Sequence, residues 1–285
     1  MILSVLTNIF LLFAPFAKRM PTIQSGTIQK KSISWFSEHL NRNVSISISS
    51  RIGQEASLPL HFVFLQDGQD YEVLDMDVTL ANFYTEFPSA NLVLVAIPTS
   101  DNRMQEYGVI DVPDYKNRGS LAGEYALFWE KELWQRIKNE YSGADQAKMT
   151  ICGFSLSGLS AFDLAWSLPY FHQVGVFSGS FWWRSKAYED DYDDENGRIM
   201  HVKVRDTAHP RPIRAWFQCG TEDEKDDRNN NGIIDSIEDT LDLIAELRKK
   251  NITDVHYEEV VGGEHHPLTW KKIMPHFLIW AHNSQ

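Results

Sequence analysis

A serine, an acid and a histidine occur in this chain in an order that would allow nucleophilic catalysis. The serine is Ser155, within the stretch from Cys152 to Gly158, which follows a short apolar run and opens onto a helical one. A chain that turns from a strand into a helix within a few residues passes close to its own backbone, so small residues flank the apex. We interpret this stretch as a nucleophile elbow with Ser155 at its apex.

The elbow pattern by itself is short and imperfect. The usual G-x-S-x-G spacing would place a glycine where Ser157 stands, and the glycine comes one residue later, at Gly158. The alternative is a glycine-containing turn between a strand and a helix that carries no chemistry. The choice depends on whether the chain also supplies a base and an acid.

Candidates for both follow later strands of the sequence. Asp223 comes after the apolar run 212–219, and His265 comes after the run 255–261. In α/β-hydrolases the chain order is serine, acid, histidine: the imidazole takes the proton of the serine hydroxyl, and the carboxylate fixes the imidazole tautomer. Two ambiguities stay open here, because Glu222 and Glu224 flank Asp223 and His266 follows His265.

The same reading predicts two backbone donors for a developing oxyanion. One is the Leu156 N–H, which starts the helix after the elbow. The other lies in the turn from Gln66 to Asp70, after an apolar run, and Gln69 is our candidate there. Together these groups predict acyl transfer to water on a small-molecule ester.

Alternating strand and helix patterns predict the elements that position these residues. A helix is expected at 73–87, and apolar residues recur at helical spacing from Leu121 to Tyr141 after a long polar loop. The alternation predicts one α/β domain over residues 31–285, with a mostly parallel sheet and helices on both faces. We expect strands at 44–49 (on a sheet edge, after a polar connector), 58–65, 91–97, 148–151, 173–180, 212–219 and 255–261.

Three aromatic residues, Phe181, Trp182 and Trp183, directly follow the expected strand 173–180. They would form a wall for an apolar or aromatic ligand. The alternative is that they pack a lid and touch no substrate.

Composition limits the partners of the chain. With 27 basic and 39 acidic side chains the formal net charge is −12, which argues against nucleic acid because a phosphate backbone needs cationic contacts. The two cysteines, Cys152 and Cys219, end apolar runs and are expected to be buried thiols, outside any disulfide framework.

The first 17 residues are apolar, but they are too few for a stable membrane span. They are similar to the apolar part of an export signal, although no Lys or Arg precedes them and Pro15 stands near the expected cleavage site. Residues 1–30 are therefore interpreted as a signal peptide and connector, which favours a periplasmic or secreted protein. The alternative is a cytoplasmic protein with an upstream start-site error.

Residues 227–238 fit a calcium loop of the EF-hand type. Oxygen ligands on alternate residues can curl round a cation, with Gly232 at the sharp turn. No clear helix enters the loop, and the alternative is an Asn/Gly-rich turn that binds nothing. We expect a structural Ca²⁺ that stabilises the turn presenting Asp223, with ligands from Asp227, Asn229, Asn231, Ile233 (backbone), Asp235 and Glu238.

Several of these segments resemble the "putative esterase" family of α/β-hydrolases, which includes enterochelin and feruloyl esterases. The resemblance runs from about Ile46 to Trp280 and is carried by residues 153–161, by residues 177–183 and by His265 with Trp270 five positions later. It implies an α/β-hydrolase fold with a small aromatic lid region. It also implies Asp223 as the acid, His265 as the base and Gln69, after the family's D-G turn, as the second oxyanion donor. Ser157 and an inserted Glu264 depart from the family pattern.

The leading function is a serine carboxylesterase that uses Ser155, His265 and Asp223 on a bulky ester, with an aromatic or catechol-bearing ester as one option. The alternatives are a sugar acetyl esterase and a non-catalytic, calcium-stabilised binding module on the same scaffold.

Overall fold

Eight strands form one sheet in the computed structural model, which describes residues 28–53 and 59–283. The strand order is β1-β2-β4-β3-β5-β6-β7-β8, antiparallel from β1 to β4 and parallel from β4 to β8. The strands are β1 (Ile28–Ser37), β2 (Arg42–Arg51), β3 (His61–Gln66), β4 (Leu92–Ile97), β5 (Lys148–Phe154), β6 (Gln173–Phe177), β7 (Arg214–Glu222) and β8 (Val255–Glu264).

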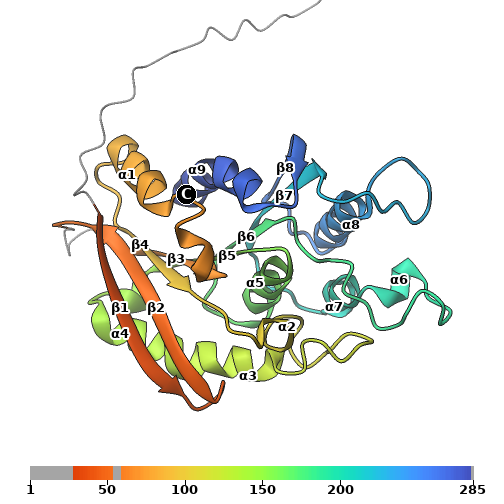
Figure 1. The fold of residues 1–285 in the computed structure, drawn as a ribbon, viewed down its shortest axis with the longest axis horizontal. Coiled ribbons are helices and arrows are strands. Elements are labelled where there is room, and N and C mark those ends of the chain that lie inside the picture. The colour runs from red at the N-terminus through yellow and green to blue at the C-terminus, as the bar shows by residue number, and fades with distance from the viewer. Residues whose placement is uncertain (1–27, 54–58, 284–285) are drawn as a thin grey trace, which may run out of the picture.

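Helices cover both faces of this sheet, as the alternating sequence pattern predicts. Figure 1 shows α1 and α9 on one side and α3 and α4 on the other. The helices are α1 (Met76–Glu86), α2 (Arg103–Glu106), α3 (Ala122–Leu127), α4 (Trp134–Glu140), α5 (Leu156–Ser167), α6 (Asp194–Gly197), α7 (Ile199–Asp206), α8 (Asp235–Lys249) and α9 (Pro267–His282). Two 3₁₀ turns lie at Gly68–Tyr71 (η1) and Ala144–Gln146, and a π-helical turn lies at Phe128–Leu133.

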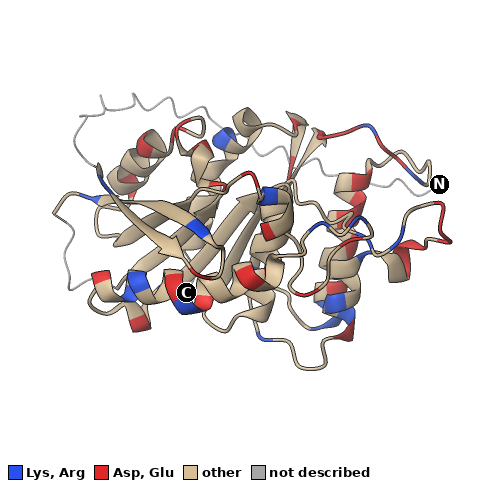
Figure 2. Cartoon of the chain, turned by 60° about the horizontal axis from the view of Figure 1, so that its bottom comes forward, with Lys and Arg blue, Asp and Glu red and all other residues tan. Residues whose placement is uncertain are grey.

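Two apolar layers hold the sheet between these helices. Every residue of β3 and β4 is buried, which explains why both read as continuous apolar runs. One layer includes Leu80 of α1 and Met274 of α9, and the other includes Leu159 of α5 and Leu243 of α8. In the cartoon of Figure 2 the colours of the charged residues accordingly lie mainly on helices and loops.

The N-terminal edge of the sheet differs from the sequence prediction. β1 lies where a polar connector was expected, and it pairs with β2 along its whole length, so β2 is not an edge strand. Most side chains of β1 are exposed, with Trp35 and Ser37 the buried ones. An edge strand held by one partner needs little apolar pattern, so the sequence signal was weak. β1 begins at Ile28, before residue 31, where the domain was expected to start.

The expected export signal in residues 1–17 lies outside the described residues. In residues 28–53 and 59–283, no helix is long and apolar enough to cross a membrane.

Candidate active site

Ser155 occupies a strained turn between β5 and α5. Its φ and ψ are 54° and −121°, a conformation that costs free energy for any residue with a Cβ and that is typical of a nucleophile elbow. Gly153 permits the turn, because a Cβ there would lie 2.4 Å from the Ser157 carbonyl oxygen. The chain adopts this costly conformation at a residue whose side chain is partly exposed.

The departure at Ser157 has a structural role. Its hydroxyl accepts a hydrogen bond from the Phe154 N–H at 2.7 Å and donates one to the Phe154 carbonyl at 2.8 Å. The side chain is fully buried. Ser157 therefore braces the elbow from inside and is not placed as a rival nucleophile.

Ser155 is tied to the segment after β6. The Ser155 N–H donates to the Phe177 carbonyl at 2.9 Å, and the Ser180 N–H donates to the Ser155 carbonyl at 3.1 Å. The two hydroxyl oxygens of Ser155 and Ser180 are 3.4 Å apart.

Asp223 follows β7 and turns back toward it. Its Oδ2 accepts the Gly220 N–H at 3.0 Å, while Oδ1 is buried without a well-formed hydrogen bond in the described part of the chain. Burial raises the pKa of Asp223, and the Gly220 N–H, the Ser178 hydroxyl and His265 oppose that rise. Of the flanking acids, Glu222 is exposed at the strand end and Glu224 accepts the Ser236 N–H.

His265 lies between β8 and α9, with its ring edge-on to Trp270 at a centroid distance of 5.4 Å. The His265 side chain is exposed to solvent on one side, and protein atoms surround the rest of its ring. This partial burial lowers the pKa of His265, Arg103 lowers it further and Asp223 opposes both. No hydrogen bond joins His265 to Ser155 or Asp223 within the described residues. Such catalytic bonds often tighten only when substrate binds.

His266 has a structural role that differs from that of His265. It is the N-cap of α9, and its Nδ1 accepts the Leu268 N–H at 3.2 Å. Asp223 thus acts electrostatically on His265, whereas His266 caps the start of a helix.

The predicted oxyanion donors start two helical turns at the ends of neighbouring parallel strands, β3 and β5. Leu156 opens α5 and Gln69 lies in η1, where first-turn N–H groups have no acceptor within the helix. Before η1, Asp67 has a left-handed backbone, and Gly68 packs so tightly that a Cβ would lie 2.5 Å from the Ile97 nitrogen. The sequence did not single out Arg103, which pairs with Asp67 through two hydrogen bonds.

The three aromatic residues after β6 do not form one wall. Phe181 and Trp183 are both 0% exposed and belong to the core. Only Trp182 is partly accessible, and the Arg118 guanidinium lies 4.9 Å from its ring centroid. For Phe181 and Trp183 the structure therefore shows the packing alternative, because buried rings present no surface to a ligand.

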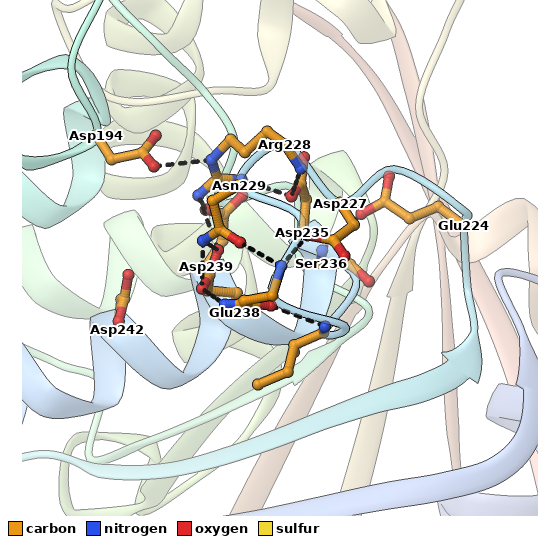
Figure 3. Close-up of polar contacts among 12 residues, drawn as sticks. Asp194, Glu224, Asp227, Arg228, Asn229, Asp235, Ser236, Glu238, Asp239 and Asp242 are labelled. Atoms are coloured by element: carbon orange, nitrogen blue, oxygen red, sulfur yellow. Dashed lines mark hydrogen bonds and ion pairs between the residues drawn. The ribbon is translucent and has the colours of Figure 1, made fainter.

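The expected calcium loop follows β7, ends in the first turn of α8 and folds on itself (Figure 3). Asp227 accepts N–H groups of Asn231 and Gly232 at 3.1 and 2.8 Å, and Glu238 accepts the Asn229 side-chain amide. Gly232 has φ 88°, as the motif requires. Ile233 is exposed. Across residues 28–53 and 59–283, no cluster of three or more His, Cys, Asp or Glu side chains is arranged to hold a metal.

Arg228 occupies the second position of this loop and neutralises part of its charge. It pairs with Asp194 at 2.8 Å and Asp235 at 3.2 Å, and it also contacts Asp239. Figure 3 shows these carboxylates gathered around the guanidinium. The burial of Asp239 raises its pKa, and Arg228 and Arg198 oppose the rise.

The sheet order, the strained Ser155 turn after β5 and the helices on both faces define an α/β-hydrolase fold. The family described as "Putative esterase" matches residues 37–281, and the chain belongs to it.

Solved structures of similar fold agree with this class. An enterochelin esterase from Shigella flexneri aligns with a TM-score of 0.66 at 20% identity, over 92% of this chain, which spans 60% of the length of that one. A ferulic acid esterase aligns with a TM-score of 0.62 at 13% identity, over 91% and 99%. An IroE-like serine hydrolase from Shewanella oneidensis aligns with a TM-score of 0.58 at 18% identity, over 85% and 76%. A comparison with curated protein sequences gives no match.

Proposed function

We propose that this protein is a serine carboxylic-ester hydrolase with Ser155 as nucleophile, His265 as general base and Asp223 as the acid that orients it. The observation that carries the proposal is the strained φ of Ser155 at the β5–α5 turn. It is supported by the electrostatic interaction between His265 and Asp223, which follow the adjacent strands β8 and β7. The family match favours the same chemistry.

In the proposed reaction the Ser155 Oγ attacks the ester carbonyl carbon while its proton passes to His265. The Leu156 and Gln69 N–H groups donate to the resulting oxyanion. The His265 imidazolium then protonates the leaving alcohol, which leaves an acyl group on Ser155. Water, deprotonated by His265, then attacks that acyl carbon. The bond to the Ser155 Oγ breaks, His265 returns the proton to this oxygen, and the carboxylic acid product leaves.

The substrate we propose is a bulky, aromatic ester. Trp182 is the accessible member of its aromatic segment, and the Arg118 guanidinium against one face of its ring helps to hold the indole in place as a stacking surface. Two of the similar structures are named as an enterobactin esterase and a ferulic acid esterase, and both names support an aromatic substrate. A sugar acetyl ester is the alternative within this reaction, and a non-catalytic binding module is the alternative outside it.

The reaction is tested by p-nitrophenyl acetate hydrolysis and by labelling with a fluorophosphonate. Wild type should turn over and carry the label on Ser155, and Ser155→Ala should lose both. Ser157→Gly, which restores the family's glycine, is the matched control and should keep the label. A chain that neither hydrolyses the ester nor labels at Ser155 would be the binding module instead.

We also propose that the loop 227–238 binds a structural Ca²⁺. The support is the match of its residues to all six EF-hand ligand positions and the positive φ of Gly232. Because Asp223 lies four residues before the loop, the ion would stabilise the turn that carries the acid. Calorimetry should detect Ca²⁺ binding that Glu238→Gln weakens. Absence of binding, or a melting temperature indifferent to chelation, would rule the ion out.

A further inference from the structure

The segment Ser178-Gly179-Ser180 lies between the proposed nucleophile and the proposed acid. β6, which it follows, is the strand between β5 and β7 in the sheet. Ser155 follows β5 and Asp223 follows β7, so the end of β6 faces both. Ser180 contacts Ser155 through its N–H and hydroxyl, as described above.

Ser178 is placed on the acid side of this segment. It is 1% exposed, and its φ of 48° is unfavourable for a residue with a Cβ. The Trp270 Nε1–H donates to the Ser178 Oγ at 3.1 Å. The hydroxyl proton is then free to point elsewhere, and hydrogen bonding by this hydroxyl lowers the pKa of Asp223.

The carboxylate in turn has room for this donor. One oxygen of Asp223 accepts the Gly220 N–H, and the other is buried with no well-formed partner in the described part of the chain. A carboxylate oxygen can accept two hydrogen bonds, so the unpaired Oδ1 can take His265 and Ser178 together. A buried acceptor left unpaired would cost free energy.

We infer that Ser178 is a positioning residue of the proposed esterase, whose hydroxyl, held by Trp270, donates to the Asp223 carboxylate and orients it toward His265. This rests on the proposed function. Trp270 contributes twice, because its ring packs edge-on against His265 while its N–H holds Ser178. Gly179 lets the segment between the two serines pack closely against β6, since a Cβ there would lie 2.5 Å from Val176 Cγ1.

The hydroxyl has a predictable effect on titration. A hydrogen bond to the charged form of a carboxylate lowers its pKa, so removing the Ser178 hydroxyl makes Asp223 more basic. A more basic carboxylate stabilises the His265 imidazolium and raises the pKa of that histidine. The other groups that act on the pair, Arg103 on His265 and the Gly220 N–H on Asp223, stay in place.

The test is Ser178→Gly, which removes the hydroxyl and suits the positive φ. We expect kcat/KM for p-nitrophenyl acetate to fall about tenfold, as for one lost hydrogen bond to a charged group, with its acid limb at higher pH. The imidazole resonances of His265, followed by NMR, should titrate at higher pH than in wild type. This readout needs no turnover, so it tests Ser178 even if the esterase proposal fails.

Two further variants guard against a merely structural effect. Trp270→Phe keeps the ring but removes the N–H that polarises the hydroxyl, so a smaller upward shift is expected. In an Asp223→Asn background, adding Ser178→Gly should change kcat/KM little. An unshifted His265 titration in both Ser178→Gly and Trp270→Phe, or a full further tenfold loss in the Asp223→Asn background, would overturn the inference.

Discussion

Arg103 pairs with Asp67 through two nitrogens, Nε to Oδ1 at 2.9 Å and Nη2 to Oδ2 at 2.7 Å. Asp67 is buried and immediately precedes Gly68 and Gln69, where the second proposed oxyanion donor lies. The Tyr107 hydroxyl accepts the Asp67 N–H at 3.2 Å. Arg103, the first residue of α2, thus holds the turn that carries the second proposed oxyanion donor, although it is far from Ser155 in the sequence.

Arg103→Met should therefore lower kcat much more than it raises KM. Without its partner the Asp67 carboxylate is buried and unpaired, so the turn shifts and the Gln69 N–H leaves its position. We expect a loss of about 10- to 100-fold in kcat, in the range of a misplaced oxyanion donor. Steady-state kinetics with p-nitrophenyl acetate measure it.

Arg198→Met is the matched control for this substitution. Arg198 also pairs with a buried acid, Asp239 at 2.7 Å, but on α8 rather than at the oxyanion turn. Thermal unfolding should show that both variants lose stability, while only Arg103→Met loses kcat. Equal loss of kcat in both would assign Arg103 a general structural role.

The pH dependence of kcat/KM should have an acid limb set by His265. The base must be neutral, so activity falls as pH drops through its pKa, and burial and Arg103 place that pKa below the ordinary histidine value. Asp223→Asn removes the group that raises this pKa, so the limb should move to lower pH although the rate falls. Arg103→Met removes a group that lowers it, so the limb should move to higher pH. Shifts of the same sign in the two variants would contradict this assignment.

The adjacent histidines should respond differently to substitution. His265→Ala should abolish acylation, with a loss of several orders of magnitude in kcat as for other triad members. His266→Ala removes the N-cap of α9 and should cost about 1 kcal/mol of stability with kcat nearly unchanged. His266→Asn, which can cap a helix, should recover the stability. Burst kinetics and thermal melts distinguish these results, and the reverse pattern would make His266 the base.

Trp182 and Trp183 should separate substrate binding from packing. Trp182→Ala should raise KM for aromatic esters while leaving acetyl esters nearly unaffected, because the accessible ring offers a stacking surface. Trp183 is fully buried, so Trp183→Ala should cost about 3–5 kcal/mol of stability. A substrate panel and urea unfolding measure these effects. An equal rise in KM for both ester types in Trp182→Ala would favour a site without aromatic selection.

Local patterns in the sequence were sufficient for the main frame of this protein. β3 and β4 read as buried strands because every residue in them is buried, and the helix α1 falls within its predicted range. Ser155 could be singled out because an elbow requires small neighbours within a few residues. The order of Ser155, Asp223 and His265 in the sequence predicted their places after three strands, β5, β7 and β8, whose carboxyl ends share one edge of the sheet. That the three residues act together stays a prediction.

Contacts between distant residues were decided only by the tertiary structure. β1 is recognisable through its pairing with β2, since an exposed edge strand carries little apolar pattern. Burial separates Phe181 and Trp183 from Trp182, although the three are consecutive. The hydrogen bonds between Arg103 and Asp67 and between Trp270 and Ser178 form only in the folded chain. A sequence states which side chains are available near each turn, but hydrogen bonds and burial depend on partners that only the packed sheet brings together.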